Sequence, residues 1–188
     1  MGTMPVTAKT YKWSILILTM PSRAESLCSL LAHLRPQQTR ADVEIMVSEN
    51  PPDYSRIGAN RQALLEQAHG EYSSFIDDDD SVAGDYVEVI YPLLDGVDYV
   101  GFGVEATRDG KPFFWSSHSL KNGKSDLMSR RDLSPRNPIR RELALRSGFE
   151  GGIGEDQRWA ERLRALGCVR TEHYLPKTMY FYRYRSVK

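Results

Sequence analysis

Four consecutive aspartates, at positions 77–80, follow directly on the apolar run at 72–76. Two like charges about 4 Å apart cost roughly 4 kcal/mol near a protein surface, so a chain that needed only a turn here could use Asn, Gly or Ser instead. Divalent cations such as Mg²⁺ or Mn²⁺ reverse this argument, because they prefer anionic oxygen ligands. In an extended segment the first and third aspartates share one side. The run therefore predicts a metal site, with a solvated acidic loop as the alternative.

Two further carboxylates, Glu155 and Asp156, follow a glycine-rich loop and open an expected helix. Acidic side chains at a helix start stabilise the helix by about 0.3–1 kcal/mol each through its dipole. This effect would explain both residues without a catalytic role. A carboxylate in a fixed position can also accept the proton of a reacting hydroxyl group. The residues alone leave both interpretations open.

The composition is that of an ordinary single domain. The chain has 188 residues with 25 Lys and Arg against 25 Asp and Glu, so the net charge of zero gives no overall attraction to nucleic acid or acidic membranes. The two cysteines, Cys28 and Cys168, lack metal-ligand spacing, which favours a reducing, cytoplasmic location. The longest apolar stretch, 15–18, is too short for a membrane span, and we expect no signal peptide. The oligomeric state stays open.

The first half of the chain alternates strands with helices. Residues 13–19 are nearly all apolar, as in a strand buried on both faces, and Gly70 is well placed to end a helix. This order favours an α/β fold with a mostly parallel, doubly wound sheet and helices on both faces. The expected strands are 13–19, 43–47 and 72–76, and the expected helices cover 27–34, 57–69 and 87–94.

The second half has a different pattern. Residues 99–106 and 112–116 flank an Asp-Gly pair, which is a good signal for a β-hairpin and hence for a smaller antiparallel element. Pro138 opens an expected helix that ends near Gly148, and a second helix runs to Leu166. An aromatic strand is expected at the end of the chain, at 179–184.

These landmarks resemble family 2 of the glycosyltransferases, which has the GT-A fold. The motifs that carry the resemblance are "TMPSR", "SENPPD", "NRQALLEQAHGEYSSFIDDDD" and "GFEGGIGEDQRWAERLRALG", in this order over roughly residues 14–185. The aspartates and the later Gly-Glu-Asp occur in the order and spacing of the family. The resemblance implies one Rossmann-like GT-A domain over 1–188, with a donor-binding half at about 13–97 and an acceptor-binding, catalytic half at about 98–188.

The resemblance also implies an activity: inverting transfer of a sugar from a nucleotide-diphosphate donor, most simply a UDP-sugar, to an acceptor hydroxyl. Charge builds on the phosphate oxygens of the leaving group, and Mn²⁺ or Mg²⁺ would stabilise this charge as a Lewis acid. By family position Asp79 ligates the metal, and Asp77 meets the ribose or the water shell of the metal. Asp156, with Glu155 beside it, is the expected base.

Further residues are expected around the donor and the acceptor, each with ordinary surface polarity as its alternative. Thr19 ends the first strand, where the family contacts the nucleotide, and Glu49 stands where the family commonly has an aspartate pair. A group of arginines before the expected base favours an anionic acceptor. The expected donor contacts are Thr19, Glu49, Arg56, Asn60, Asp77, Asp78 and Arg183, the extra candidate metal ligand is His173, and the acceptor candidates are Arg130, Arg131, Arg140 and Arg141.

Two other functions fit parts of the pattern. A phosphohydrolase of the haloacid dehalogenase type also binds Mg²⁺ through an Asp-x-Asp after an apolar strand, but that strand is its first, whereas here it is the third. A non-catalytic nucleotide-sugar binding module would not need both carboxylate motifs. The sequence leaves open the sugar and the acceptor, which could be a saccharide, a protein side chain, a lipid carrier or a modified DNA base.

Overall fold

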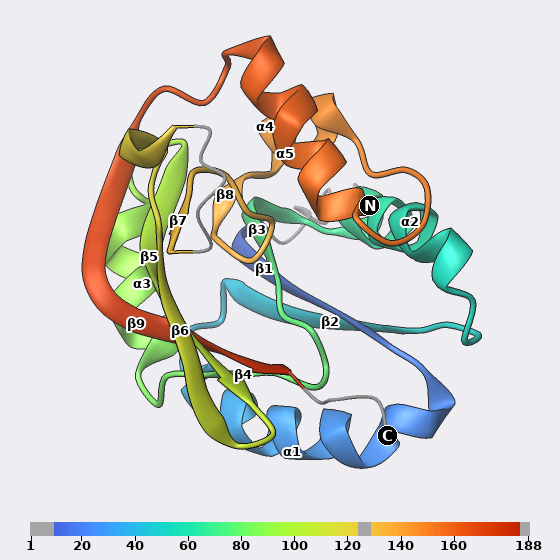
Figure 1. The fold of residues 1–188 in the computed structure, drawn as a ribbon. Coiled ribbons are helices and arrows are strands. Elements are labelled where there is room, and N and C mark those ends of the chain that lie inside the picture. Colours follow the sequence, from blue (N-terminus) through green and yellow to red (C-terminus); the bar gives the residue numbers. More distant parts are fainter. Residues whose placement is uncertain (1–9, 124–128, 185–188) are drawn as a thin grey trace, which may run out of the picture.

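The structure is a computed structural model that describes residues 10–123 and 129–184. The parts of the expected domain 1–188 at 1–9, 124–128 and 185–188 lie outside the described residues. Within the described residues, nine strands form one sheet in the order β2-β1-β3-β8-β5-β6-β7, and β9 joins β5 to β4. Helices cover both faces of the sheet (Figure 1), as the alternating pattern predicts.

The first three long strands run parallel. β1 (Tyr11–Thr19) lies between β2 (Val43–Glu49) and β3 (Gly70–Phe75), and its Leu16 pairs with Met46 on one side and Phe75 on the other. Parallel strands bring their carboxyl ends to one edge of the sheet, which is where ligands bind in open α/β sheets. Residue Thr19 and the aspartate run therefore meet at this edge.

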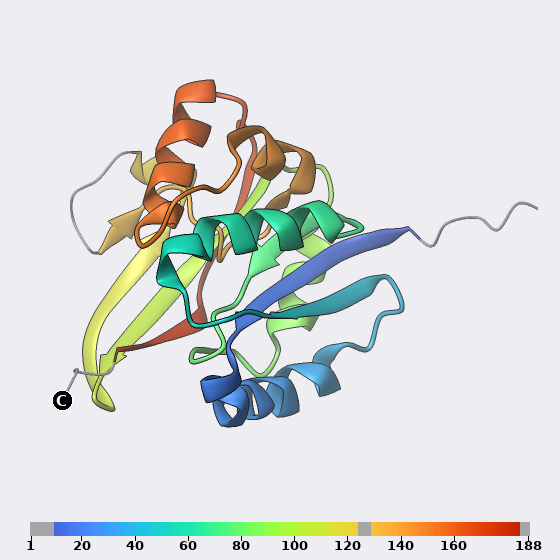
Figure 2. The same cartoon turned by 90° about the vertical axis from the view of Figure 1, so that its right-hand side faces the viewer.

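The two faces of β1 bury two separate cores. Trp13, Ile15 and Ile17 face one side and pack with α1 (Ala24–Leu34) and α3 (Tyr86–Ile90). Leu16 faces the other side and packs with α2 (Ile57–Gln67), α4 (Arg141–Ser147) and α5 (Glu155–Leu166). Figure 2 shows α1 and α2 on opposite sides of β1 and β2. The continuous apolar sequence of β1 follows from this burial on both faces.

The second half adds a curved hairpin. β5 (Tyr99–Arg108) and β6 (Lys111–His118) are antiparallel around Asp109 and Gly110, whose φ angles of 51° and 77° match the expected two-residue turn. The remaining strands are β4 (Ser81–Val82), β7 (Arg130–Arg131), β8 (Ile139–Arg140) and β9 (Glu172–Tyr184). The long β9 lies against β5 in Figure 1 and ends beside β4.

Three boundaries differ from expectation, each for a local reason. Pro138 does not open a helix: its carbonyl accepts from the Val100 amide, and Ile139 pairs with both β3 and β5, so the helix starts three residues later, at Arg141. The helix expected at 87–94 is α3 followed by a 3-10 turn, Tyr91–Leu94, because Pro92 cannot continue an α-helical ladder. The final strand starts at Glu172, well before the aromatic residues.

No helix in residues 10–123 and 129–184 is long and apolar enough to cross a membrane. Cys28 and Cys168 are both free thiols.

Candidate active site

The aspartate run leaves β3 with alternating exposure. The side chains of Asp77 and Asp79 are 22% and 32% exposed, whereas Asp78 is 2% and Asp80 4% exposed. The segment is a turn and not the extended segment that was expected: residues 78 and 79 form the turn, and the Asp80 amide donates to the Asp77 carbonyl at 3.1 Å. The first and third carboxylates therefore face the edge of the sheet, while the second and fourth are turned into the protein.

The buried pair of aspartates fastens the loop to its surroundings. Asp78 accepts hydrogen bonds of 2.7 Å from Thr19 Oγ1 and from Arg23 Nη1, which tie the loop to the end of β1 and the start of α1. Asp80 accepts from the Tyr180 hydroxyl at 2.6 Å and from the Arg183 amide at 2.8 Å. Burial, together with the charge of Asp77, raises the pKa of Asp80 to about 7.

Asp77 is clamped between two arginines. Arg61 Nη2 and Arg136 Nη2 each donate to one of its carboxylate oxygens at 2.7 Å. Burial alone would raise the pKa of Asp77, but the charges of Arg136 and Arg61 hold it well below its usual range. Asp77 is therefore an anion already paired by protein cations.

The same arginines extend to the second carboxylate motif. Arg61 Nε donates to Glu155 Oε1 at 2.9 Å, and Arg136 Nη1 lies 3.6 Å from Asp156 Oδ2. The chain of charges Glu155–Arg61–Asp77–Arg136–Asp156 thus connects two motifs that are far apart in the sequence. Burial acts to raise the pKa of Asp156, but Arg136 and then Arg131 outweigh it and lower the pKa. Asp156 is consequently ionised at neutral pH and able to accept a proton.

A tight contact with α2 fixes the glycine loop that carries these carboxylates. The Gly58 amide donates to the Gly151 carbonyl at 2.9 Å, and a Cβ on Gly58 would lie 2.5 Å from the carbonyl carbon of Glu150. Gly154 then takes a left-handed conformation, with φ of 85°, just before α5 begins. Only glycine adopts this region without a steric penalty.

We expect the substitution Gly58→Ala to displace the loop at 150–154 and lower activity more than stability. The added methyl group meets backbone atoms, which cannot rotate away. The expected result is a donor hydrolysis rate at least tenfold lower, with UDP binding retained. Gly84→Ala is the matched control, because nothing lies within 4 Å of a Cβ at that glycine. Equal rates for both variants would contradict a positioning role for this contact.

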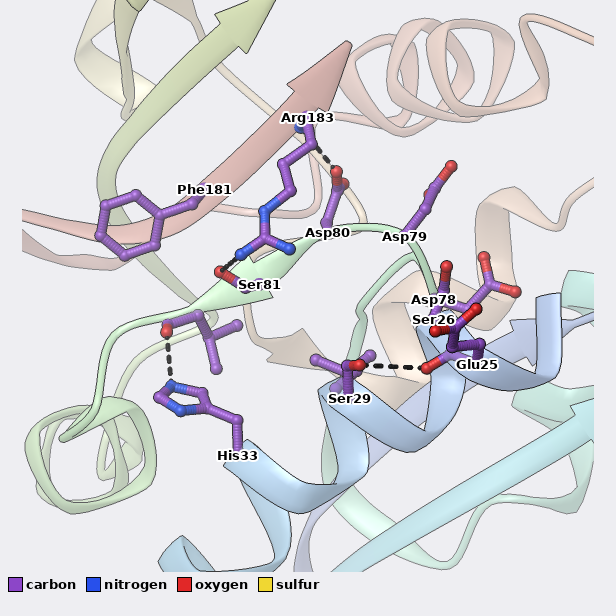
Figure 3. Close-up of a pocket in the computed structure, with 12 residues that line it drawn as sticks. Glu25, Ser26, Ser29, His33, Asp78, Asp79, Asp80, Ser81, Phe181 and Arg183 are labelled. Carbon is purple, nitrogen blue, oxygen red and sulfur yellow. Dashed lines mark hydrogen bonds between the residues drawn. The ribbon is translucent and has the colours of Figure 1, made fainter. Parts of the chain in front are cut away.

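Two cavities border the aspartate run, and another shares Asp156 and Arg136 with one of them. The first, about 310 Å³, lies between the ends of β1 and β3 and the start of α5, and we call it the donor-side cavity. The second, about 690 Å³, lies between β6, β7, the end of β9 and α5, and we call it the acceptor-side cavity. Asp156, Arg136 and Tyr182 line both. The third, about 520 Å³, is bordered by α1 and Arg183 (Figure 3).

Most of the residues expected from the sequence lie at these cavities. Arg183 lines the third cavity, where it donates to Ser81 and, through its backbone, to Asp80 (Figure 3). Arg130 and Arg131 line the acceptor-side cavity. Glu49 and Arg56 are exposed and line none of the three. The expected residues that line the donor-side cavity are Thr19, Asn60, Asp77, Asp78, Asp79, Glu155 and Asp156.

His173 does not lie with the aspartates, which corrects its expected place as a metal ligand. Its Nδ1 lies 2.8 Å from the Leu93 carbonyl, near the start of β9. Arg183, which contacts Asp80, lies ten residues further along that strand, roughly 30 Å away at the usual rise. The histidine is an exposed strand residue.

Arg140 and Arg141 also lie away from the expected acceptor side. Arg140 donates to Glu71 at 2.7 Å, and Arg141 Nε donates to the Gly70 carbonyl at 2.9 Å. Gly70 begins β3, whereas the aspartates follow its end, so these arginines border the opposite edge of the sheet. They secure β8 and α4 to β3.

The main residues that the sequence analysis missed are Arg61 and Arg136. Arg61 is 7% and Arg136 12% exposed as side chains, so both guanidinium groups are buried beside the carboxylates. Arg61 follows Asn60 within one of the quoted motifs. Its place on the buried face of α2, with Leu64 and Leu65, would have been the signal that this arginine points inward. Arg136 lies in a loop and had no such signal.

The donor set suits a metal bound jointly with a ligand rather than by the protein alone. Among the described residues, no group of three His, Cys, Asp or Glu side chains lies close enough together to hold a metal ion. Mg²⁺ is commonly held by one or two carboxylates and by the phosphates of a substrate. Asp79 fits that role: burial and the charges of Asp77 and Asp78 raise its pKa despite Arg23, and a cation would relieve this repulsion.

Comparisons with known proteins agree with this architecture. Among solved structures, S. aureus TarS 1-349 in complex with UDP-GlcNAc is similar, with 17% identity, a TM-score of 0.68 and coverage of 94% of this chain and 60% of that chain. TarS 1-349 in complex with UDP gives 18% identity, a TM-score of 0.69 and coverage of 92% and 60%. This chain thus spans about 60% of those proteins, and the likeness shows a shared fold.

The family comparison is more specific. No curated protein matches the sequence. The family model "Glycosyl transferase family 2" matches residues 50–150, which is more than half of the chain and contains the aspartate run. The chain therefore belongs to glycosyl transferase family 2, with the GT-A fold.

Proposed function

We propose that this chain transfers a sugar from a nucleotide-diphosphate donor, a UDP-sugar, to an acceptor hydroxyl with inversion at the anomeric carbon. The observation that carries the proposal is the position of Asp156, an ionised carboxylate that lines both the donor-side and the acceptor-side cavity. We also propose that residues 1–188 act as one domain, with the donor bound mainly by 13–97 and the acceptor mainly by 98–188. The crystal structures of S. aureus TarS 1-349, which has this fold, are complexes with UDP and with UDP-GlcNAc.

The donor-side cavity has the groups that a nucleotide diphosphate needs. Asn50, Asp53 and Tyr54 line its outer part and suit a base and ribose. Arg23, which is held by Asp78 and Asp79, and Arg136 supply positive charge for phosphate oxygens. Asp79 would hold Mn²⁺ or Mg²⁺, which as a Lewis acid stabilises charge on a leaving diphosphate.

The reaction itself is a single displacement. The acceptor oxygen bonds to the anomeric carbon as the bond from that carbon to the diphosphate breaks on the opposite face, which inverts the configuration. The hydroxyl proton passes to a carboxylate oxygen of Asp156. Arg131 and Arg136 keep this carboxylate ionised beforehand and hold it at the junction of the two cavities. Glu155 is paired with Arg61 and serves in positioning.

The other two functions fit less well. A phosphohydrolase of the haloacid dehalogenase type needs an open nucleophilic aspartate, whereas Asp77 is clamped by two arginines. A non-catalytic binding module would have no use for an ionised, partly open carboxylate between two cavities. Hydrolysis of UDP-glucose or UDP-N-acetylglucosamine, measured with and without Mn²⁺, tests the proposal, because only a transferase would release UDP together with the free sugar.

We expect UDP to raise the melting temperature only when Mn²⁺ or Mg²⁺ is present, and Asp79→Asn to remove this coupling. The carboxylate at 79 is the most exposed of the four, and its partner Arg23, 3.2 Å away, keeps its closer pair with Asp78, so the substitution leaves the apo fold intact. Asp95→Asn is the matched control, because Asp95 is 74% exposed and pairs with Lys12, away from the aspartate run. Equal stabilisation by UDP in EDTA would argue against a metal-bridged diphosphate.

A further inference from the structure

The acceptor-side cavity contains a buried histidine that the proposed reaction does not use. His118 ends β6, is 4% exposed and lines the cavity. Its strand partner is Arg131, which in turn contacts Asp156 at 3.4 Å. The imidazole thus lies in the same cavity as the proposed base, behind the arginine that holds that base.

The surroundings of His118 fix its tautomer. Its Nδ1 lies 2.7 Å from Oδ1 of Asn137, and the Asn137 amide nitrogen donates to the Val100 carbonyl at 3.0 Å. Because the asparagine turns its oxygen toward the ring, Nδ1 of His118 must carry the hydrogen. Burial lowers the pKa of His118 to about 3, so the ring is neutral and Nε2 keeps its lone pair.

Within residues 10–123 and 129–184, the His118 ring bonds through Nδ1 to Asn137, and Nε2 is not one of the fully buried atoms that lack a partner. Nε2 therefore stays available to a ligand in the cavity that supplies a donor. Arg130 and Arg131 in the same cavity donate only. A hydroxyl group can donate to Nε2 and at the same time accept from a guanidinium, which a carboxylate or a phosphate cannot do.

One wall of the cavity is aromatic. Tyr182 and Tyr184 have ring centroids 4.3 Å apart, and Phe114 lies 6.2 Å from Tyr184. Aromatic faces carry negative charge density and attract the slightly positive C–H groups on one face of a pyranose ring. Hydroxyl recognition by His118 on one side and an aromatic wall on the other together match a sugar ring.

We propose that the acceptor is a saccharide, and that Nε2 of His118 binds it by accepting a hydrogen bond from a hydroxyl next to the one that reacts. Asn137 is a positioning residue that holds the histidine in the accepting tautomer. The inference rests on the proposed function for the transfer step, although saccharide binding itself is measurable without it.

The first test compares variants with methyl hexopyranosides as acceptor probes. His118→Phe keeps a flat ring but has no acceptor, so we expect KM for a methyl hexopyranoside to rise about tenfold, the effect of one lost hydrogen bond, with little change in kcat. His118→Gln offers an amide oxygen in place of Nε2 and should restore most of the affinity. His69→Phe is the control, since His69 is exposed and lies outside the cavities. Equal KM values in His118→Phe and the wild type would overturn the proposal.

The second test needs no variant and therefore does not depend on how His118→Phe folds. The chain has four histidines, so the imidazole nitrogens of the ¹⁵N-labelled protein give a simple NMR spectrum. We expect one ring in the Nδ1–H form whose Nε2 signal shifts when a methyl hexopyranoside is added. An Nε2 signal that no hexopyranoside moves, or that moves only with a single-stranded oligonucleotide, would overturn the saccharide class. If the wild-type protein neither bound UDP nor hydrolysed a UDP-sugar, the proposed function would be wrong, whatever the Nε2 signal shows.

Discussion

Asp156→Asn is expected to reduce hydrolysis of a UDP-sugar, with water as the acceptor, by about 10²–10⁴-fold, the usual loss when a general base is removed. Asparagine keeps the shape of the side chain but cannot take up a proton. The carboxylate lies at the junction of the two cavities; its partner Arg136 lines both, and its partner Arg131 lines the acceptor-side cavity. The measurement is the steady-state rate of UDP release with Mn²⁺ present.

The control for this prediction is Glu155→Gln. Glu155 is 6% exposed and pairs with Arg61, so this substitution should lower stability while the base stays in place. UDP-dependent stabilisation of Asp156→Asn should match that of the wild type, because no donor group is lost. A variant Asp156→Asn with a normal rate, alongside a stable but inactive Glu155→Gln, would reverse the assignment within the pair.

The parts of the site predictable from the sequence are those governed by local periodicity. The parallel order of β1–β3 follows from their alternation with helices. The first and third aspartates are the more exposed ones, as expected, although residues 78 and 79 lie in a turn and not in an extended segment. The turn at Asp109 and Gly110 follows from the need for two positive φ angles. Each of these depends on a few neighbouring residues.

The parts that could not be predicted depend on pairings over long distances in the chain. Arg140 and Arg141 seemed to precede the base because they are close to it in sequence, but β8 bonds to the start of β3 and carries them to the far edge. Arg61 meets Glu155 across 94 residues and Arg136 meets Asp77 across 59. No local pattern reports which of the many arginines becomes the buried partner of a given carboxylate.

The largest expected loss of stability is that of Arg61→Met. The Arg61 side chain is 7% exposed and forms ion pairs with both Glu155 and Asp77. Methionine fills much of the same volume without charge, so the buried carboxylates lose a cation. Removing one partner of a buried ion pair costs about 3–5 kcal/mol. Urea unfolding should show a lower midpoint with an unchanged slope.

A second substitution separates lost charge pairing from lost packing. In the double variant Arg61→Met/Glu155→Gln, the Glu155 carboxylate that has lost its arginine is replaced by a neutral amide. This double variant should therefore be more stable than Arg61→Met alone. Lys177→Met is the exposed control: Lys177 and its partner Asp85 are 45% and 40% exposed, and such a pair contributes at most about 1 kcal/mol. If the double variant were as unstable as the sum of the single variants, the two side chains would not interact, and the charge chain from Glu155 to Asp156 could not be what holds the two carboxylate motifs together.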